Sequence, residues 1–386
     1  MEEQQIKESK RKRVHIALVG GQPMPVYVGI RYTKPDEVIL IHSKESKAEA
    51  DRITTLVRRD YKNVSVAFKE FVAVNMQKII NDAKVLLDEL DDDSEFFVDI
   101  TSGTKPWSIV FFRSFVNRSH TTVIYVGQNN GVYDVVTGNR VQFESNINMD
   151  VVFSLYNTNA TDFISFSDVT KEDIETVDKL MTMRRANFRA FNELTQIDTN
   201  NLKKTDLVNS YDGSTISWNK DEGWIKLELE RKRNIPLYHK FDSPHIFRIL
   251  FNAGWFEFDV AYRLSKWKIA SDIRIGVKFP YREGMPKNEI DIILNLGNRL
   301  LFVECKTQIY DITDLDKFSK AVRNFGGLGS KMLFVTYEKM KDTAVQKCND
   351  NDILTLSYAD ANFNNAEVEK RLRTLLNEKI TLINRK

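Results

Sequence analysis

The sequence contains few of the residues that build disulfide-bonded or zinc-centred folds. Of its 386 residues, 2 are cysteine and 5 are histidine, too few for a disulfide framework or a structural zinc site. It has no run of about 18 apolar residues, so we expect no membrane span. Residues 1–13 are polar and charged, without the apolar centre of a secretion signal. These absences favour a cytoplasmic protein with no membrane partner.

A large excess of one charge is also lacking. The formal net charge is +2 and the isoelectric point is about 8.2, whereas proteins that coat nucleic acid without specificity are more basic. Any phosphate binding must therefore come from local groups of residues. The hydrophobic content of 42% and charged content of 28% are typical of a globular chain, and the length allows two or three domains.

The first 148 residues alternate strand and helix signals. Segments 45–61 and 74–90 carry apolar residues at spacings of three and four, which predicts helices. Short apolar runs that flank them predict strands at 14–19, 38–42, 64–68, 96–100 and 122–126. This alternation indicates a parallel sheet with helices on both faces, closed by a hairpin over 131–138. We therefore expect a Rossmann-like domain over residues 1–148.

Hydroxyl groups and a lysine follow the fourth predicted strand. Residues 101–105, Thr-Ser-Gly-Thr-Lys, lie between that strand and a helix that starts near Pro106. Free amides, hydroxyls and a lysine at a helix start can bind an anion, although the same residues also make an ordinary capped turn. Neither phosphate-binding glycine motif, Gly-x-x-x-x-Gly-Lys or Gly-x-Gly-x-x-Gly, is present. Because ligands of such sheets lie at the carboxyl ends of the strands, residues 20–23 should lie at the same edge.

These two loops together resemble the CARF domain (CRISPR-associated Rossmann fold) over about residues 13–148. The resemblance implies a sensor of cyclic oligoadenylates, most commonly cyclic tetra-adenylate, bound across a homodimer interface. Gln22 and Pro23 would line the pocket from the first loop. The residues that would hold ligand phosphates or riboses are Thr101, Ser102, Gly103, Thr104 and Lys105. We expect Trp107 to pack within its helix instead of stacking on a base.

A second group of charged residues lies on two predicted strands that meet near Gly297. Glu304 and Lys306 project from the same face of the second strand, since side chains alternate along a strand, and Asp291 lies on the first. Such charges are costly to bury unless they bind a cation or each other. The pattern therefore indicates either a metal site or a structural ion-pair cluster.

The order of elements around these strands resembles the PD-(D/E)xK nuclease superfamily, with its restriction-endonuclease-like fold, over about residues 244–337. By this resemblance, Asp291, Glu304 and the carbonyl of Cys305 would hold Mg²⁺ or Mn²⁺, which prefer oxygen ligands. Lys306 would orient or activate the attacking water, and Glu257 would be a supporting catalytic carboxylate. The expected nuclease domain spans residues 241–386. Residues 149–240 would form a linker or a small subdomain.

A sensor joined to a nuclease resembles the ancillary nucleases of type III CRISPR antiviral systems. This implies a homodimeric, metal-dependent enzyme that cleaves or nicks DNA, RNA or both when cyclic oligoadenylate binds. Two alternatives remain: a ligand-responsive regulator without nuclease activity, and a ring nuclease that degrades the ligand. The basic residues that could follow a phosphate backbone are Arg263, Lys266, Lys268, Arg282, Lys287 and Arg299.

Overall fold

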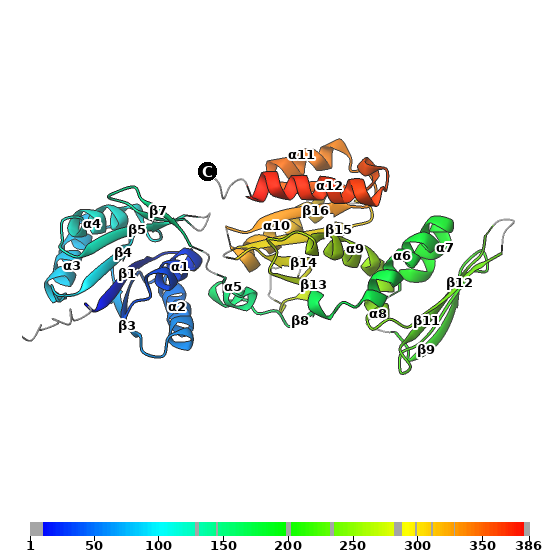
Figure 1. Cartoon of the computed structure of the whole chain (residues 1–386), viewed down its shortest axis with the longest axis horizontal. Coiled ribbons are helices and arrows are strands. Elements are labelled where there is room, and N and C mark those ends of the chain that lie inside the picture. Colours follow the sequence, from blue (N-terminus) through cyan, green and yellow to red (C-terminus); the bar gives the residue numbers. More distant parts are fainter. Residues whose placement is uncertain are drawn as a thin grey trace, which may run out of the picture.

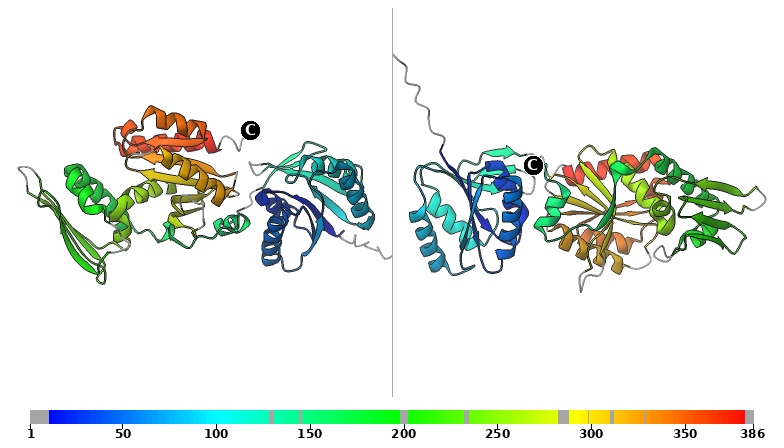
Figure 2. Two further views of the ribbon diagram at one scale, coloured as in Figure 1. Left: turned by 180° about the vertical axis from the view of Figure 1, so that it is seen from behind. Right: turned by 90° about the horizontal axis from the view of Figure 1, so that it is seen from below.

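The computed structural model describes residues 11–127, 131–143, 146–197, 202–231, 235–281, 288–297, 299–309, 312–327 and 329–381. Within these residues the strands form a seven-stranded, a four-stranded and a six-stranded sheet. The seven-stranded and four-stranded sheets lie at opposite ends of an elongated molecule, with the six-stranded sheet between them (Figures 1 and 2).

The N-terminal sheet is a Rossmann-like sheet, as the alternating signals predict. Its strands run in the order β3-β2-β1-β4-β5-β6-β7, and the first five of these are parallel. They are β1 (Arg13–Val19), β2 (Glu37–His42), β3 (Ser65–Glu70), β4 (Glu95–Asp99), β5 (Thr121–Val126), β6 (Gly131–Asp134) and β7 (Arg140–Gln142). One face packs against α1 (Pro23–Thr33) and α2 (Lys47–Asp60). The other packs against α3 (Met76–Glu89) and α4 (Lys105–Phe115).

The segment expected as a linker or small subdomain contributes to all three parts of the molecule. It contains α5 (Met149–Leu155), β8 (Asp162–Ser165), η1 (Phe166–Asp168), α6 (Lys171–Ala186) and α7 (Phe188–Thr195). The four-stranded antiparallel sheet follows, with β9 (Thr205–Asn209), β10 (Thr215–Asn219), β11 (Trp224–Leu229) and β12 (Leu237–Phe241). Strand β8 joins the six-stranded sheet by pairing with β13, and α5 packs against α1, α2 and α10.

The six-stranded sheet has the order β17-β16-β15-β14-β13-β8. The elements α9, β13, β14, β15, α10 and β16 follow one another along the chain. The C-terminal elements are α8 (Ile246–Leu250), η3 (Phe251–Ala253), α9 (Gly254–Ser265), β13 (Asp272–Lys278), β14 (Glu289–Asn295), β15 (Leu300–Lys306), α10 (Thr313–Gly326), β16 (Lys331–Thr336), α11 (Asp342–Asp350), β17 (Ile353–Ser357), η4 (Ala359–Ala361), α12 (Asn365–Leu376) and η5 (Asn377–Thr381). Apolar residues of α9 and α12 share one core, and those of α10 and α11 share another.

The N-terminal and six-stranded sheets are joined by more than the chain connection. One apolar core contains residues of α1, α2, α5 and α10. The Ile147 amide donates to the Gly297 carbonyl at 3.1 Å, and Asn295 Nδ2 donates to the Ile147 carbonyl at 2.7 Å. The segment before α5 is thereby fixed to the turn between β14 and β15. Within the described ranges, no helix is both long and apolar enough to cross a membrane.

Candidate functional sites

The loop after β4 is held by a buried aspartate. Asp99 Oδ1 accepts hydrogen bonds from the backbone amide of Thr101, at 2.9 Å, and from the Thr101 hydroxyl. The same hydroxyl oxygen accepts from the Val126 amide at 2.7 Å. Thr101 therefore ties the ends of two neighbouring strands together at the carboxyl edge of the sheet, where the sequence predicts the ligand.

The two predicted ligand loops touch each other through glycines. The Gly20 amide donates to Ser102 Oγ at 3.0 Å, and a Cβ added to Gly20 would lie 2.7 Å from the Gly103 amide nitrogen. Gly103 has φ +91°, a left-handed conformation that favours glycine. The close approach of the loops therefore depends on both glycines.

The second half of this loop begins α4. The Thr104 hydroxyl accepts from the Trp107 amide at 3.4 Å and donates to the Ala73 carbonyl at 2.9 Å. Gly103 and Lys105 are exposed. Trp107 is 1% exposed and its Nε1 donates to the Val72 carbonyl, so it packs in the core as expected. Thr104 thus acts as a helix cap, while Lys105 is available to a ligand.

Two of the predicted ligand residues, Gln22 and Thr101, line a common cavity of about 190 Å³. Pro23 is buried at the start of α1, and Pro25 lines the cavity two residues later. The cavity wall also includes residues that the sequence does not mark as ligand residues, because they come from α5 and the C-terminal domain: Val152, Tyr156, Arg299, Gly326 and Gly329.

The predicted nuclease residues converge on β14 and β15. Asp291 Oδ2 accepts from the Cys305 amide at 2.7 Å, and Lys306 Nζ lies 2.9 Å from Glu304 Oε1. Asp291 is 8% exposed and Glu304 2%. Burial of Lys306 disfavours its positive charge, but the nearby Asp291 and Glu304 carboxylates outweigh this effect and raise the pKa of Lys306. This side chain therefore remains an ammonium ion at neutral pH.

Glu257 reaches this site from the first turn of α9. It lines a cavity of about 520 Å³ together with Asp291, Lys306 and Glu289. Burial and then the Asp291 charge raise the pKa of Glu257 well above its ordinary value, and Glu289 acts in the same direction. Such crowding of carboxylates is relieved by a cation or by a proton.

The chemistry of these donors fits Mg²⁺ or Mn²⁺, since Asp291 and Glu304 offer buried, hard oxygen ligands. In the part of the chain that the structure describes, no group of three or more His, Cys, Asp or Glu side chains is arranged to hold a metal. A metal here would therefore need ligands in addition to the Asp291 and Glu304 side chains, such as the Cys305 carbonyl and water. Burial, with the nearby carboxylates, raises the pKa of the Cys305 thiol well above its ordinary value, which does not suit a thiolate nucleophile.

Sequence reasoning missed Arg248 of α8. Its guanidinium lies across Gly276 of β13, where an added Cβ would come within 1.7 Å of Nη2. Arg248 lines the same cavity as Glu257, and its Nη2 lies 3.9 Å from Glu289 Oε1. Gly276 has φ +59° and leaves the space that the arginine occupies. The sequence signal that could have indicated this contact is Gly276 itself, because a single glycine inside a strand often marks the close approach of another group.

Of the basic residues expected near nucleic acid, Arg263 is buried and bonded to Asp259 at 2.9 Å, which makes it a structural residue. Lys266 contacts Glu369 at 2.9 Å, and Lys268 is exposed. Arg282 and Lys287 lie outside the described residues.

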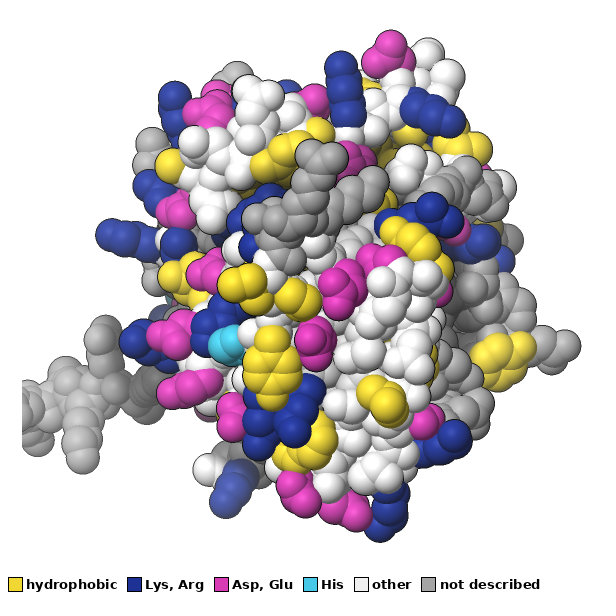
Figure 3. Space-filling view, turned by 90° about the vertical axis from the view of Figure 1, so that its right-hand side faces the viewer, with side chains coloured by type: hydrophobic (Ala, Val, Ile, Leu, Met, Phe, Trp, Pro, Cys, Tyr) yellow, Lys and Arg dark blue, Asp and Glu magenta, His cyan; other side chains and the backbone are white. Residues whose placement is uncertain are grey.

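The outward face of the four-stranded sheet combines aromatic and basic side chains. Lys226 and Lys240 are paired across β11 and β12, with their ammonium groups 4.7 and 5.4 Å from the centre of the Trp224 ring. Tyr238 is 58% exposed on the same face. Figure 3 shows basic and hydrophobic side chains interleaved at this end of the molecule. Lys220, in the turn between β10 and β11, lines the Glu257 cavity.

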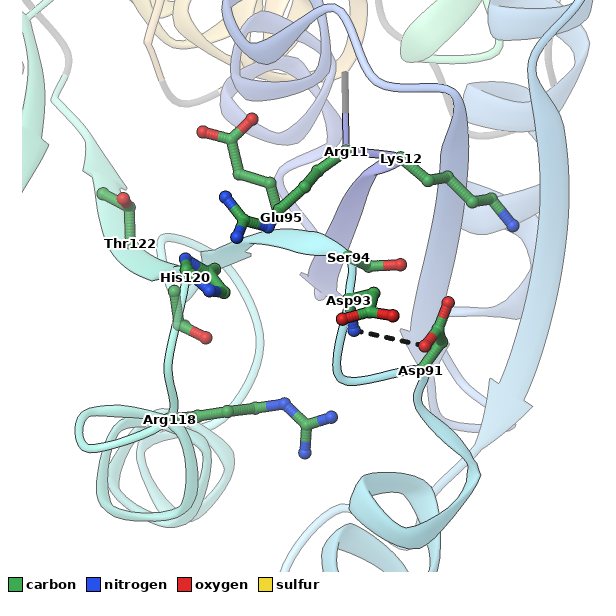
Figure 4. A pocket seen from close by; sticks show the side chains of 10 residues that line it. Arg11, Lys12, Asp91, Asp93, Ser94, Glu95, Arg118, His120 and Thr122 are labelled. Carbon is green, nitrogen blue, oxygen red and sulfur yellow. Dashed lines mark hydrogen bonds between the residues drawn. The ribbon is translucent and has the colours of Figure 1, made fainter. Parts of the chain in front are cut away.

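A cavity of about 1,050 Å³ lies at the opposite edge of the N-terminal sheet, where β4 and β5 begin (Figure 4). Its charged groups have both signs. Arg118 is bonded to the Leu90 carbonyl and to Asp92, and Arg13 lies 3.2 Å from Glu95. These contacts make it a surface held by local ion pairs, away from the edge where the ligand loops lie.

Comparison with protein families identifies the N-terminal part of the chain. Residues 14–156 match the family model of the Card1 CARF domain. These residues form a CARF domain. The match includes both ligand loops and extends through α5 to Tyr156. Among curated proteins, no sequence matches significantly.

Solved structures share the fold beyond the CARF domain. Can2 from Sulfobacillus thermosulfidooxidans, in complex with cyclic tetra-adenylate, matches with a TM-score of 0.66 at 16% identity, over 95% of this chain and 99% of Can2. Protein VC1899 from Vibrio cholerae matches with a TM-score of 0.73 at 15% identity, over 95% and 98%. A type III CRISPR defence DNA nuclease activated by cyclic oligoadenylate matches with a TM-score of 0.55 at 14% identity, over 85% of this chain and 46% of the nuclease. These likenesses confirm the expected α/β fold class, in which a C-terminal α/β domain follows the CARF domain.

Proposed function

We propose that this protein is a metal-dependent nuclease of type III CRISPR defence that is switched on by cyclic oligoadenylate, with cyclic tetra-adenylate as the first candidate. The observation that carries the proposal is the convergence of Asp291, Glu304, Lys306 and Glu257 on one site in a chain that begins with a CARF domain. The cyclic tetra-adenylate bound to Can2 and the activation of the DNA nuclease by cyclic oligoadenylate support the choice of ligand.

Asp291, Glu304 and the Cys305 carbonyl would hold Mg²⁺ or Mn²⁺. When bound, such an ion supplies Lewis acidity and lowers the pKa of a water molecule. Because Lys306 stays protonated, it would donate hydrogen bonds to the phosphate and to the water, and it would not take up the water's proton. The Glu257 carboxylate, which lines the same cavity as Asp291 and Lys306, would accept that proton when a bound metal ion keeps it ionised. Arg248 would bind a phosphate oxygen from the opposite wall of the cavity.

The aromatic and basic face of the four-stranded sheet favours a single strand as substrate. Bases can stack on Trp224 and Tyr238 while Lys226 and Lys240 neutralise phosphates, which is how single strands are held without sequence preference. The same sheet reaches the cavity through Lys220 in the β10–β11 turn, which could contact a phosphate there. We therefore propose that single-stranded DNA or RNA, or single-stranded regions within longer molecules, are cleaved.

The test is cleavage of labelled single-stranded RNA, single-stranded DNA and double-stranded DNA by the full-length protein, with and without cyclic tetra-adenylate and Mn²⁺. We expect cleavage when both are present, and loss of at least about 10³-fold in rate for Glu304→Gln, since a metal carboxylate is removed. The absence of cleavage under every combination, with cyclic hexa-adenylate also tried, would exclude the nuclease. Shortening of the activator itself would favour the ring-nuclease alternative.

A further inference from the structure

The cavity beside the CARF ligand loops is built by both domains. Gln22 and Thr101 lie on its CARF side. Its other wall is formed by Arg299, in the turn that joins β14 to β15, by Gly326 at the end of α10, and by Gly329, which follows that helix. Any group that enters this cavity therefore touches the strand pair that carries Asp291 and Glu304.

Tyr156 joins the two walls directly. Its hydroxyl donates to Gln22 Oε1 at 3.4 Å. Its ring lies so close to Gly327 that an added Cβ there would come within 2.3 Å of it. Burial raises the pKa of Tyr156 to about 12, so the phenol stays neutral and remains a donor. The first ligand loop is thus in contact, through one side chain, with the segment that follows α10.

Arg299 gives the cavity the chemistry of an anion site. It is 7% exposed, and its Nη2 donates to the Ile380 carbonyl at 3.1 Å. Burial lowers the pKa of this guanidinium, and its five N–H donors allow it to bind an anion in addition to its contacts within the protein. A guanidinium binds phosphate through two parallel hydrogen bonds, with geometric specificity that an ammonium lacks.

The size of the cavity limits what can enter. Sites that enclose a whole small ligand measure about 300–1,000 Å³, and this cavity measures about 190 Å³. It can take one phosphate of a cyclic oligoadenylate with its ribose, and the rest of the ring would lie over Gly103 and Lys105, which are exposed on the same edge.

We propose that the C-terminal domain supplies part of the activator site, with Arg299 binding a phosphate of the cyclic oligoadenylate and Gly326 and Gly329 forming the adjoining wall. The proposal rests on the proposed function, because it takes cyclic oligoadenylate as the ligand. It adds that the ligand binds against the turn of the β14–β15 hairpin, so that binding and the geometry of the nuclease strands are directly linked.

The experiment is titration calorimetry of full-length protein with cyclic tetra-adenylate, without added metal. Arg299→Met should weaken binding at least about tenfold, since a charge-assisted, bidentate contact is lost. Arg299→Lys should recover only part of that loss. Lys370→Met removes an exposed charge from α12 of the same domain and is the matched control, with affinity expected within twofold of wild type. Wild-type affinity in Arg299→Met would overturn the proposal.

A second variant protects the test against misfolding at Arg299. A Cβ added to Gly329 meets no atom within 4 Å, so Gly329→Leu should fold and place its side chain at the cavity wall. We expect at least about a tenfold loss of affinity, because the added side chain competes with the ligand for a small cavity. Unchanged binding in Gly329→Leu, like unchanged binding in Arg299→Met, overturns this inference and leaves the sensor function standing. A wild-type protein that binds no cyclic oligoadenylate overturns the sensor function, and this inference with it.

Discussion

Asp99 holds the loop after β4, which carries Thr101, and ionisation of this buried carboxyl should lower the stability of the fold by a measurable amount. The side chain is fully buried beneath the loop, and its Oδ1 binds Thr101. Its Oδ2 has no hydrogen-bond partner among the described residues and lies 3.9 Å from His15 Nε2. Burial raises the pKa of Asp99 to about 7 and lowers the pKa of His15 to about 3. Between these values both groups are neutral, so their contact is not an ion pair.

The consequence for Asp99→Asn follows from linkage. A carboxyl group whose pKa rises on folding stabilises the protein fully below its unfolded pKa, and that contribution is lost as pH rises through the folded pKa. Because the pKa moves from 3.8 to about 7, ionising Asp99 in the fold costs about 4 kcal/mol more than in the unfolded chain. Asparagine keeps the Oδ1 acceptor for Thr101 and cannot ionise. It places an amide near His15 Nε2, a neutral nitrogen that can accept a hydrogen bond when Nδ1 donates to Thr33.

We therefore expect Asp99→Asn to raise the free energy of unfolding by about 2–4 kcal/mol at pH 9, and to have little effect at pH 4. The gain should develop mainly between pH 4 and 7, where the unfolded chain has lost the proton and the fold still holds it, and should level off above pH 7. His15 is present in both proteins, so its own titration cancels in the difference. Urea unfolding followed by circular dichroism at pH 4, 7 and 9 measures the effect.

The control for this test is Asp134→Asn in the β6–β7 hairpin. Partial burial of Asp134 acts to raise its pKa, but hydrogen bonds from Thr137 and the Val136 amide outweigh this effect and lower the pKa of Asp134. That substitution should therefore cost stability at pH 4, 7 and 9 alike, the opposite sign, because the contribution of Asp134 is lost only as pH falls through its lowered pKa. A gain in Asp99→Asn that is the same at pH 4 and pH 9, or a loss at pH 9, would refute the argument.

Three further predictions concern the two sites. Arg248→Met should lower the single-turnover cleavage rate about tenfold or more at saturating activator, with Arg248→Lys intermediate, because a phosphate contact is removed; rates equal to wild type would remove Arg248 from the site. Trp224→Ala should weaken binding of single-stranded DNA by about 1–3 kcal/mol in fluorescence anisotropy, while activator affinity is unchanged; unaltered DNA binding would show that the sheet face is not used. Gly20→Ala should lower the melting temperature and weaken activator binding, since its Cβ would lie 2.7 Å from the Gly103 amide nitrogen; a variant that melts and binds as wild type does would mean that the loops can separate without effect.

Local patterns in the sequence predict what lies on one strand or one turn. The alternation of side chains places Glu304 and Lys306 on one face, and the hairpin brings Asp291 beside them, so no long-range information is needed. Arg248 depends on a different kind of fact. It enters the site only because Gly276, in another element, leaves room for its guanidinium. An arginine in a short helix gives no such signal by itself.

The contacts between domains are the part that sequence patterns could not supply. Arg299 is a charged residue in a predicted turn, which is typical of the surface, and the sequence suggests that it contacts the phosphate backbone of a nucleic acid. The structure instead buries it beside the CARF ligand loops. Tyr156 lies just after α5, in a segment whose periodicity was uninformative, and its contacts with Gln22 and Gly327 depend on how two domains pack. Periodicity reports the face that an element buries and does not report which partner covers it.

The placement of Arg299 bears on how an activator could control the nuclease carboxylates. Glu304 lies five residues along β15 from Arg299, about 17 Å at the rise of an extended strand. The strands between them are buried on both faces and hydrogen-bonded to neighbours on both sides. The β14–β15 hairpin should therefore move as a rigid unit, because its closely packed side chains leave no space in which a displacement of the turn could be taken up. Activation still requires the ligand to bind one arrangement of the hairpin more tightly than another. A phosphate that pairs with Arg299 only when the turn approaches the CARF loops would provide that difference, and the same contact would then account for both the affinity and the switching.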